Sequence, residues 1–189
     1  MFSRISELIK SESVAAIIFE DYDKGNITQG LIERVVSLAN KKNIPTAVDP
    51  KKERFLDYKN ISLFKPNFKE LEEGLDIKIS KEHDAIVIAD QKLRLELNHD
   101  ISLITLSEKG VFVSDKISSN SYPAHIRNIS DVSGAGDTVI AVATLCLAAD
   151  LDSSTIAQVS NLAGGLVCEV AGVISINKQN LLDETLSII

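Results

Sequence analysis

Asp131-Val132-Ser133-Gly134-Ala135-Gly136-Asp137 stands directly before an apolar run over residues 138–149. Two glycines around an alanine leave several backbone N–H groups unobstructed at the start of the helix that this run predicts, and the helix dipole adds partial positive charge there. We therefore expect the loop to bind an anion. Asp137 follows it, where a carboxylate can accept a proton from a hydroxyl while the loop holds a phosphoryl group. An anion-binding loop beside a base is expected for phosphoryl transfer to an alcohol.

A purely structural interpretation of the same residues is also open. Ser133 can act as the N-terminal cap of the predicted helix, because serine is among the residues preferred at that position. Asp137 would then be an acidic residue of the first turn, where the helix dipole favours a negative charge. A lone Ser-Gly-x-Gly-Asp sequence would favour this interpretation, so the choice depends on the rest of the chain.

Length, composition and charge limit the classes of protein to consider. The chain has 189 residues, of which 44% are hydrophobic and 25% charged, as expected for a single globular domain over residues 1–189. The net charge of −7 argues against a surface for nucleic acids or anionic membranes. Residues 1–9 form an amphipathic start that does not resemble a signal peptide, and the run 138–149 is too short to span a bilayer. We therefore expect a cytoplasmic protein with no nucleic-acid or membrane partner.

The cysteines and histidines form no recognisable site. Cys146 and Cys168 lie in apolar helical stretches, without histidines or further cysteines at metal-ligand spacing, so we expect two buried small side chains. His83, His99 and His125 are scattered through polar surroundings. We expect all three histidines at the surface.

Short apolar strands alternate with helical segments along the chain. This alternation predicts a three-layer α/β fold, in which a mostly parallel sheet carries helices on both faces. The predicted strands are Val14–Phe19, Pro45–Val48, Ile61–Phe64, Ile101–Leu106 and Val111–Ser114. The predicted helices cover about 28–42, 67–73, 81–98, 135–149 and 153–171, with a last one from about 178, and Thr28 is the expected cap of the first.

Polar clusters follow four of the predicted strands. In parallel sheets, ligands bind beyond the carboxyl ends of the strands, so these clusters predict one shared cleft there. The clusters are residues 21–25, 49–51, 65–67 and 107–110. Lys24 and Lys51 could each contact phosphate oxygens in that cleft or remain solvated surface charges.

Asn67-Phe68-Lys69-Glu70 is a second stretch with two interpretations. Asparagine followed three residues later by glutamate has the spacing of a capping box, which is common at helix starts and favoured by the spacing alone.

A resemblance to a known family favours the chemical interpretation of both stretches. Residues 131–137 resemble the Asp-Thr-x-Gly-Ala-Gly-Asp signature of the ribokinase-like (PfkB) carbohydrate kinases, with Val132 in place of the threonine, and residues 65–71 resemble their Pro-Asn-x-x-Glu element. Residues 19–25 resemble the Ser-Asp-Tyr-x-Lys-Gly of the heptose-phosphate kinases, which form the kinase half of the bifunctional ADP-heptose synthesis enzymes. The matches extend from Phe19 nearly to the end of the chain.

This resemblance implies an ATP-dependent kinase that uses Mg²⁺ and phosphorylates a hydroxyl of a sugar or sugar phosphate, with heptose 7-phosphate as the expected acceptor. It implies that Asp137 is the catalytic base and that Gly134, Ala135 and Gly136 form the anion hole. Asn67 and Glu70 would organise Mg²⁺ through water. The residues implied at the nucleotide are Asn67, Phe68, Lys69, Glu70, Ser107, Lys109, Gly110, Asn161 and Gly164.

Two of these implied contacts have equally good structural alternatives. Residues 107–110 also fit a plain hairpin turn. The pair Gly164-Gly165, which the family packs beside the adenine, also fits close packing of two helices.

The members of this family are longer and carry an N-terminal half, with a Gly-Gly element and a small β-lid, before the region that matches. We therefore expect this chain to be the C-terminal, nucleotide-binding portion of such a kinase. An incomplete sheet would expose strand edges and favour self-association, for example as a homodimer. Two alternatives remain: a truncated, non-catalytic nucleotide-binding module, and a vitamin or nucleoside kinase of the same superfamily.

Overall fold

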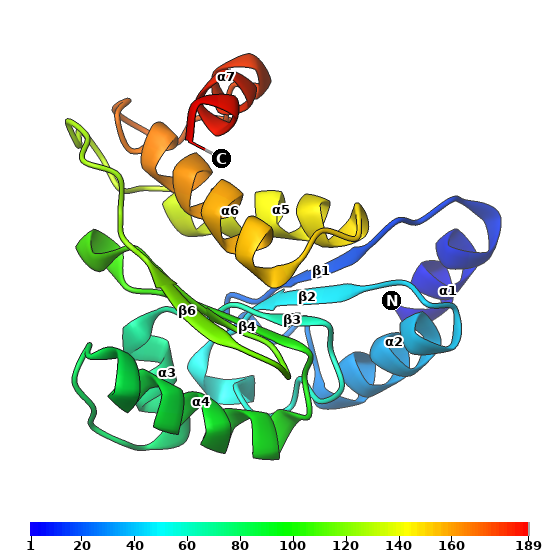
Figure 1. Cartoon of the computed structure of the whole chain (residues 1–189). Helices are drawn as coiled ribbons and strands as arrows, with labels where there is room; N and C mark the ends of the chain where they lie inside the picture. Colours follow the sequence, from blue (N-terminus) through cyan, green and yellow to red (C-terminus); the bar gives the residue numbers. More distant parts are fainter. Residues whose placement is uncertain (189) are drawn as a thin grey trace.

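A six-stranded sheet in the order β1-β2-β3-β4-β5-β6 runs through the computed structural model, which describes residues 1–188 (Figure 1). Strands β1 to β4 are parallel, while β5 and β6 are added antiparallel at one edge. The strands are β1 (Ile17–Glu20), β2 (Thr46–Asp49), β3 (Leu63–Phe64), β4 (Ile101–Thr105), β5 (Val111–Ser114) and β6 (Ser119–Tyr122). The predicted three-layer α/β architecture is confirmed.

Helices cover both faces of the sheet (Figure 1). One layer contains α2 (Gln29–Lys41), α3 (Phe68–Leu75) and α4 (His83–Leu97), with α1 (Phe2–Ser11) packed against α2. The opposite layer contains α5 (Ala135–Ala148) and α6 (Ser153–Val167), and α7 (Lys178–Ile188) packs on α6. Short 3₁₀ turns, η1 (Lys52–Arg54) and η2 (Ser107–Lys109), follow β2 and β4. Within residues 1–188, no helix has the length and apolar character needed to cross a membrane.

The central strands are buried on both faces, which explains their continuous apolar sequences. Val48 and Phe64 point into the core shared with α2, α3 and α4. Their neighbours Ala47 and Leu63 point into the second core, formed with α5 and α6. Successive side chains of a strand alternate between faces, so an apolar residue is needed at every position of a strand that is covered twice.

Local signals place most helix boundaries close to the predicted ones. The Thr28 side chain accepts a hydrogen bond from the N–H of Leu31 at 3.3 Å, which confirms Thr28 as the cap of α2. Helix α4 begins at His83, two residues later than predicted, and ends beside Asn98, whose backbone is left-handed. Strand β6 was not predicted, because Ser119–Tyr122 is a polar segment that pairs with β5 without burying alternate side chains.

The expectation for His99 is wrong, whereas that for the two cysteines is confirmed. His99 is completely buried, and its Nε2 forms a hydrogen bond with Ser102 Oγ. Burial, with the nearby positive charges of Arg94 and Lys116, lowers the pKa of His99 to about 3. The polar residues beside His99 in the sequence concealed its burial just before β4. Both cysteines are buried free thiols.

Gly74 in α3 permits close contact with an aromatic ring. A β-carbon at Gly74 would lie 2.2 Å from Cδ1 of Phe55, which is buried and packs edge-on against Phe64. We therefore expect Gly74→Ala to lower the free energy of unfolding by about 1–3 kcal/mol, since the core has no room for an added methyl group. Urea denaturation measures this change.

Gly30 in α2 provides the matched control, because a β-carbon there would meet no atom within 4 Å. Gly30→Ala should leave the urea midpoint unchanged or raise it, since alanine favours helix more than glycine does. Equal midpoints for the two variants would contradict the close contact at Gly74.

Candidate active site

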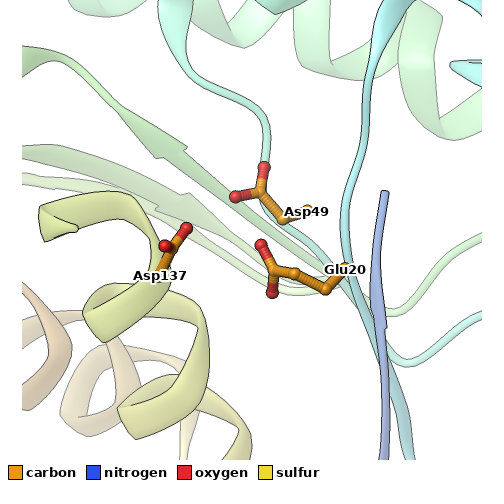
Figure 2. A group of neighbouring side chains, drawn as sticks. All are labelled: Glu20, Asp49 and Asp137. Atoms are coloured by element: carbon orange, nitrogen blue, oxygen red, sulfur yellow. The ribbon is translucent and has the colours of Figure 1, made fainter. Parts of the chain in front are cut away.

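Three carboxylates meet where the parallel strands end. Glu20 is the last residue of β1, Asp49 is the last residue of β2, and Asp137 lies in the first turn of α5. One oxygen from each carboxylate lies within 4.8 Å of the other two (Figure 2). The predicted base therefore lies at the carboxyl edge of the sheet, where the sequence predicts a ligand cleft. The sequence did not predict that Glu20 belongs to this carboxylate group. The only feature that could have indicated it is the position of Glu20 as the last residue of a strand.

Two lysines bring positive charge to this group. Lys65, directly after β3, places its Nζ 3.2 Å from Asp49 Oδ2, and its side chain is only 3% exposed. Lys51, just after β2, lies 3.3 Å from Asp49 Oδ1 and 2.6 Å from Glu70 Oε1. Lys51 is therefore held inside the cleft by two carboxylates, which argues against its interpretation as a solvated surface charge.

The environment of Glu20 makes its ionisation unfavourable. Burial raises its pKa to about 7, and repulsion from Asp49 and Asp137 adds to this effect, while Lys65 and Lys51 offset part of it. Near neutral pH, Glu20 therefore exists in comparable amounts as carboxylic acid and carboxylate.

The glycine loop leaves the start of α5 uncapped. Gly134 is the N-cap residue with a φ of 79°, a left-handed conformation that favours glycine, and no side chain caps the helix. Ser133 instead donates its hydroxyl to Asp131 Oδ1 at 2.8 Å, so the interpretation of Ser133 as the helix cap is wrong. In the described chain, the N–H groups of Gly136 and Asp137 have no acceptor. Free N–H groups at a helix start are the feature that binds anions.

Asp131 holds the glycine loop in place. Its carboxylate accepts hydrogen bonds from the N–H of Ser133 at 3.0 Å and from the N–H of Gly172 at 3.0 Å, in addition to the Ser133 hydroxyl. These hydrogen bonds lower the pKa of Asp131, with those from Ser133 contributing most. The loop is therefore tied to the segment between α6 and α7.

Asn67 and Glu70 form the capping box that their spacing predicts. Asn67 Oδ1 accepts from the N–H of Glu70 at 2.9 Å, and Glu70 Oε2 accepts from the N–H of Asn67 at 2.8 Å. Glu70 Oε1 accepts from Lys51, so this carboxylate also faces the cleft. The structural interpretation is therefore correct, while the implied role toward Mg²⁺ stays a prediction.

The residues are chemically suited to Mg²⁺. Mg²⁺ binds oxygen ligands, usually one or two carboxylates together with water and phosphate oxygens. Glu20, Asp49 and Asp137 offer such oxygens at the cleft. Both oxygens of Glu70 already accept hydrogen bonds within the protein. Contact through water is therefore the role that suits Glu70.

The turn at residues 107–110 has a structural reason for its glycine. Gly110 has a φ of 89°, and a β-carbon there would lie 2.1 Å from the Tyr122 carbonyl oxygen. Lys109 Nζ lies 3.8 Å from Glu82 Oε1. The roles of Ser107, Lys109 and Gly110 toward a nucleotide stay predictions.

Asn161 and Gly164 lie in α6, on the opposite layer from Phe68 and Lys69 in α3. Asn161 donates to the Pro123 carbonyl oxygen at 2.9 Å, and a β-carbon at Gly164 would lie 2.7 Å from Val139 Cγ2. Gly164 therefore permits close packing of α5 and α6, as one of its two interpretations predicted.

Lys81 Nζ lies over the Phe68 ring, 5.6 Å from its centre. The exposed Lys69 places its Nζ 3.7 Å from Glu73 Oε1. Within residues 1–188, no hydrogen bond or ion pair joins Phe68, Lys69, Asn161 or Gly164 to the carboxylate group. Their roles toward a nucleotide stay predictions.

Fold and site together define an α/β protein with an uncapped helix start and a group of carboxylates at the carboxyl edge of its parallel strands, which is the arrangement expected of a phosphotransferase. The sequence profile described as "pfkB family carbohydrate kinase" matches residues 14–180. The chain belongs to this family.

Relatives named "Bifunctional protein HldE" confirm the resemblance to the bifunctional enzymes. The protein of Aliarcobacter butzleri is 37% identical over 164 residues, which cover 86% of this chain and 34% of that protein. The protein of Campylobacter jejuni is 34% identical over 171 residues, covering 89% and 36%. The chain therefore spans about a third of the length of these relatives.

Solved structures show the same fold. Phosphofructokinase-2 from Escherichia coli in complex with potassium superposes with a TM-score of 0.85 at 20% identity, covering 98% of this chain and 62% of that one. Ribokinase from Arabidopsis thaliana, complexed with ribose and ATP, gives a TM-score of 0.75 at 18% identity, covering 89% and 55%.

The crowding around Glu20 predicts a pH-dependent stability. The pKa of Glu20 is about 7 in the folded protein and 4.5 in the unfolded chain. Between these pH values the folded protein keeps a proton that the unfolded chain has released. The contribution of Glu20 to the free energy of unfolding therefore falls as the pH rises from 4.5 to 7. Glu20→Gln should remove this fall and stabilise the protein by about 1–2 kcal/mol at pH 8, after allowance for solvent screening.

Urea denaturation at pH 5 and at pH 8 tests this expectation. Glu96→Gln is the control, because Glu96 is an exposed residue of α4. The difference in stability between Glu20→Gln and the unmodified protein should be larger at pH 8 than at pH 5. An equal difference at both pH values would contradict the raised pKa of Glu20.

Proposed function

We propose that this chain provides the nucleotide-binding and catalytic part of an ATP-dependent carbohydrate kinase, which phosphorylates a hydroxyl of a sugar or sugar phosphate. One observation carries the proposal. The Asp137 carboxylate stands directly behind an uncapped helix start, at the edge of the sheet where ligands of parallel α/β proteins bind. Membership of the pfkB family supports it.

The glycine loop would hold the phosphoryl group that is transferred. The γ-phosphate of ATP lies over Gly134–Gly136, where the free N–H groups of α5 stabilise its charge. Asp137 orients the acceptor hydroxyl and accepts its proton. The hydroxyl oxygen forms a bond to the γ-phosphorus in line with the bond to the leaving oxygen, which breaks and releases ADP.

Charges around the loop would orient the phosphates. Lys51 can direct its ammonium group at phosphate oxygens, because its side chain is 31% exposed. Asn67 and Glu70 would hold Mg²⁺ through water. When bound with ATP, Mg²⁺ neutralises charge on the β- and γ-phosphates.

The acceptor is proposed from similarity. The relatives named HldE match most of this chain at 37% and 34% identity, and residues 19–25 resemble the strand end of heptose-phosphate kinases. We therefore include heptose 7-phosphate as the acceptor.

A cytoplasmic location goes with the use of ATP. Self-association as a homodimer is also included, because β1 is the outer strand of the sheet and Ile18 on it is 39% exposed.

A second candidate is a nucleotide-binding module without catalysis of its own. The span of the chain, about a third of the length of its relatives, favours it for this polypeptide taken alone. Asp137 favours the kinase, since nucleotide binding does not need a base beside the anion hole. A vitamin or nucleoside kinase of the same superfamily differs only in its acceptor.

Asp137→Asn tests the kinase directly. The test uses a longer protein in which this chain is extended upstream in its source reading frame. There we expect the substitution to lower kcat by about 10²–10⁴-fold, because the amide cannot accept the proton. ATP affinity should stay within about twofold, because the glycine loop is unchanged. The measurement is ADP release from ATP and Mg²⁺ with heptose 7-phosphate and a panel of other sugars, vitamins and nucleosides.

Asp183→Asn, an exposed change on α7, is the control and should keep full turnover. Retained turnover in Asp137→Asn would exclude Asp137 as the base. ATP binding without ADP release, by this chain and by the longer protein on every acceptor, would favour the binding module.

A further inference from the structure

Tyr22 contacts the proposed base, Asp137, from a distant part of the chain. Its hydroxyl lies 3.3 Å from Asp137 Oδ1 and 3.4 Å from Asp137 Oδ2, so the O–H donates to the carboxylate between its two oxygens. Tyr22 belongs to the segment that follows β1, whereas Asp137 belongs to α5. The contact therefore joins the end of β1 to the start of α5.

The backbone on both sides of Tyr22 is anchored. Asp21 is 3% exposed and accepts hydrogen bonds from the Tyr58 hydroxyl at 2.6 Å and from the N–H of Asp23 at 2.9 Å. Asp23 accepts from the N–H of Glu53 at 3.4 Å. The fold thus fixes the position of the Tyr22 backbone, although the side chain itself is 53% exposed. The contact with Asp137 results from this anchoring.

A neutral donor suits the charges at this position. Asp137 lies close to two other carboxylates, Glu20 and Asp49, and the two lysines of the cleft pair with Asp49 and Glu70. Among residues 1–188, Asp137 forms no ion pair. A hydroxyl that donates to Asp137 adds no further negative charge. Partial burial, Asp137 and Glu20 raise the pKa of Tyr22, so its proton is retained at neutral pH.

We propose that Tyr22 is a positioning residue for Asp137: its hydroxyl fixes the rotation of the carboxylate so that one oxygen faces the acceptor hydroxyl. This inference rests on the proposed role of Asp137 as the base. Asp137 is an exposed side chain, so it would otherwise rotate freely. A carboxylate has about four lone-pair positions, and one hydroxyl donor leaves room for the acceptor hydroxyl.

Titration of the tyrosine hydroxyls tests the contact without any need for catalysis. Absorbance of tyrosinate is followed against pH in this chain, and the difference from Tyr22→Phe identifies the Tyr22 signal among the three tyrosines. We expect Asp137→Asn to lower the pKa of Tyr22 toward its ordinary value, and Asp183→Asn to leave it unchanged. An unchanged Tyr22 titration in Asp137→Asn would overturn the contact and the proposal with it.

Kinetics of the longer protein test the positioning role. Tyr22→Phe should lower kcat about tenfold with the KM for ATP unchanged, because it removes a hydrogen bond to a charged group outside the anion hole. Tyr122→Phe is the matched control, since that hydroxyl bonds Ser154 at 2.5 Å and should not affect kcat. Unchanged kcat in Tyr22→Phe, together with lost turnover in Asp137→Asn, would overturn the positioning role and leave the proposed function standing. Full turnover in Asp137→Asn would overturn both, even if the Tyr22 titration had confirmed the contact.

Discussion

The buried ion pair between Lys65 and Asp49 connects the elements that form the site. The Lys65 side chain is 3% exposed and the Asp49 side chain is 6% exposed, and their charged atoms lie 3.2 Å apart. A β-carbon at Gly136 would lie 3.7 Å from Lys65 Nζ, so the first turn of α5 packs directly over this pair. Loss of Asp49 would leave the buried Lys65 ammonium uncompensated, which costs about 3–5 kcal/mol, whereas loss of Lys65 would leave Asp49 paired with Lys51. The ends of β2 and β3 and the start of α5 therefore depend on one another.

The balance of charge around this pair is negative. Four carboxylates share the cleft with two ammonium groups: Glu20, Asp49, Glu70 and Asp137 face Lys51 and Lys65. Burial, together with this excess, raises the pKa of Glu20, and the excess would repel the phosphates of a nucleotide. The free N–H groups of α5 supply partial positive charge at the place where the phosphoryl group is proposed to bind. A divalent cation would supply the rest, which supports the inclusion of Mg²⁺ in the proposed function.

Features that depend on nearby residues could be predicted from the sequence. The glycine loop, the Thr28 cap and the Asn67–Glu70 capping box all involve partners within a few positions, and each was located correctly. The strands buried on both faces could also be predicted, since each needs a continuous apolar run.

Features that depend on distant residues could not be predicted. The Tyr22 hydroxyl contacts a carboxylate 115 positions away, and His99 is buried by packing that its polar neighbours do not indicate. Strand β6 exists because it pairs with β5, and its own sequence carries no apolar pattern. Glu20 joins the carboxylate group only because β1 and β2 end at the same level.

The most direct measurement records the backbone amide signals of Gly134, Gly136 and Asp137 by ¹⁵N NMR while ATP and Mg²⁺ are added to this chain. The amide groups at the start of α5 are proposed to hold the γ-phosphate, so we expect their chemical shifts to change more than those of any other segment. Addition of ADP and Mg²⁺ should change them less, because ADP lacks that phosphate. Saturable ATP binding that leaves these three signals unchanged would contradict the glycine loop as the phosphate site.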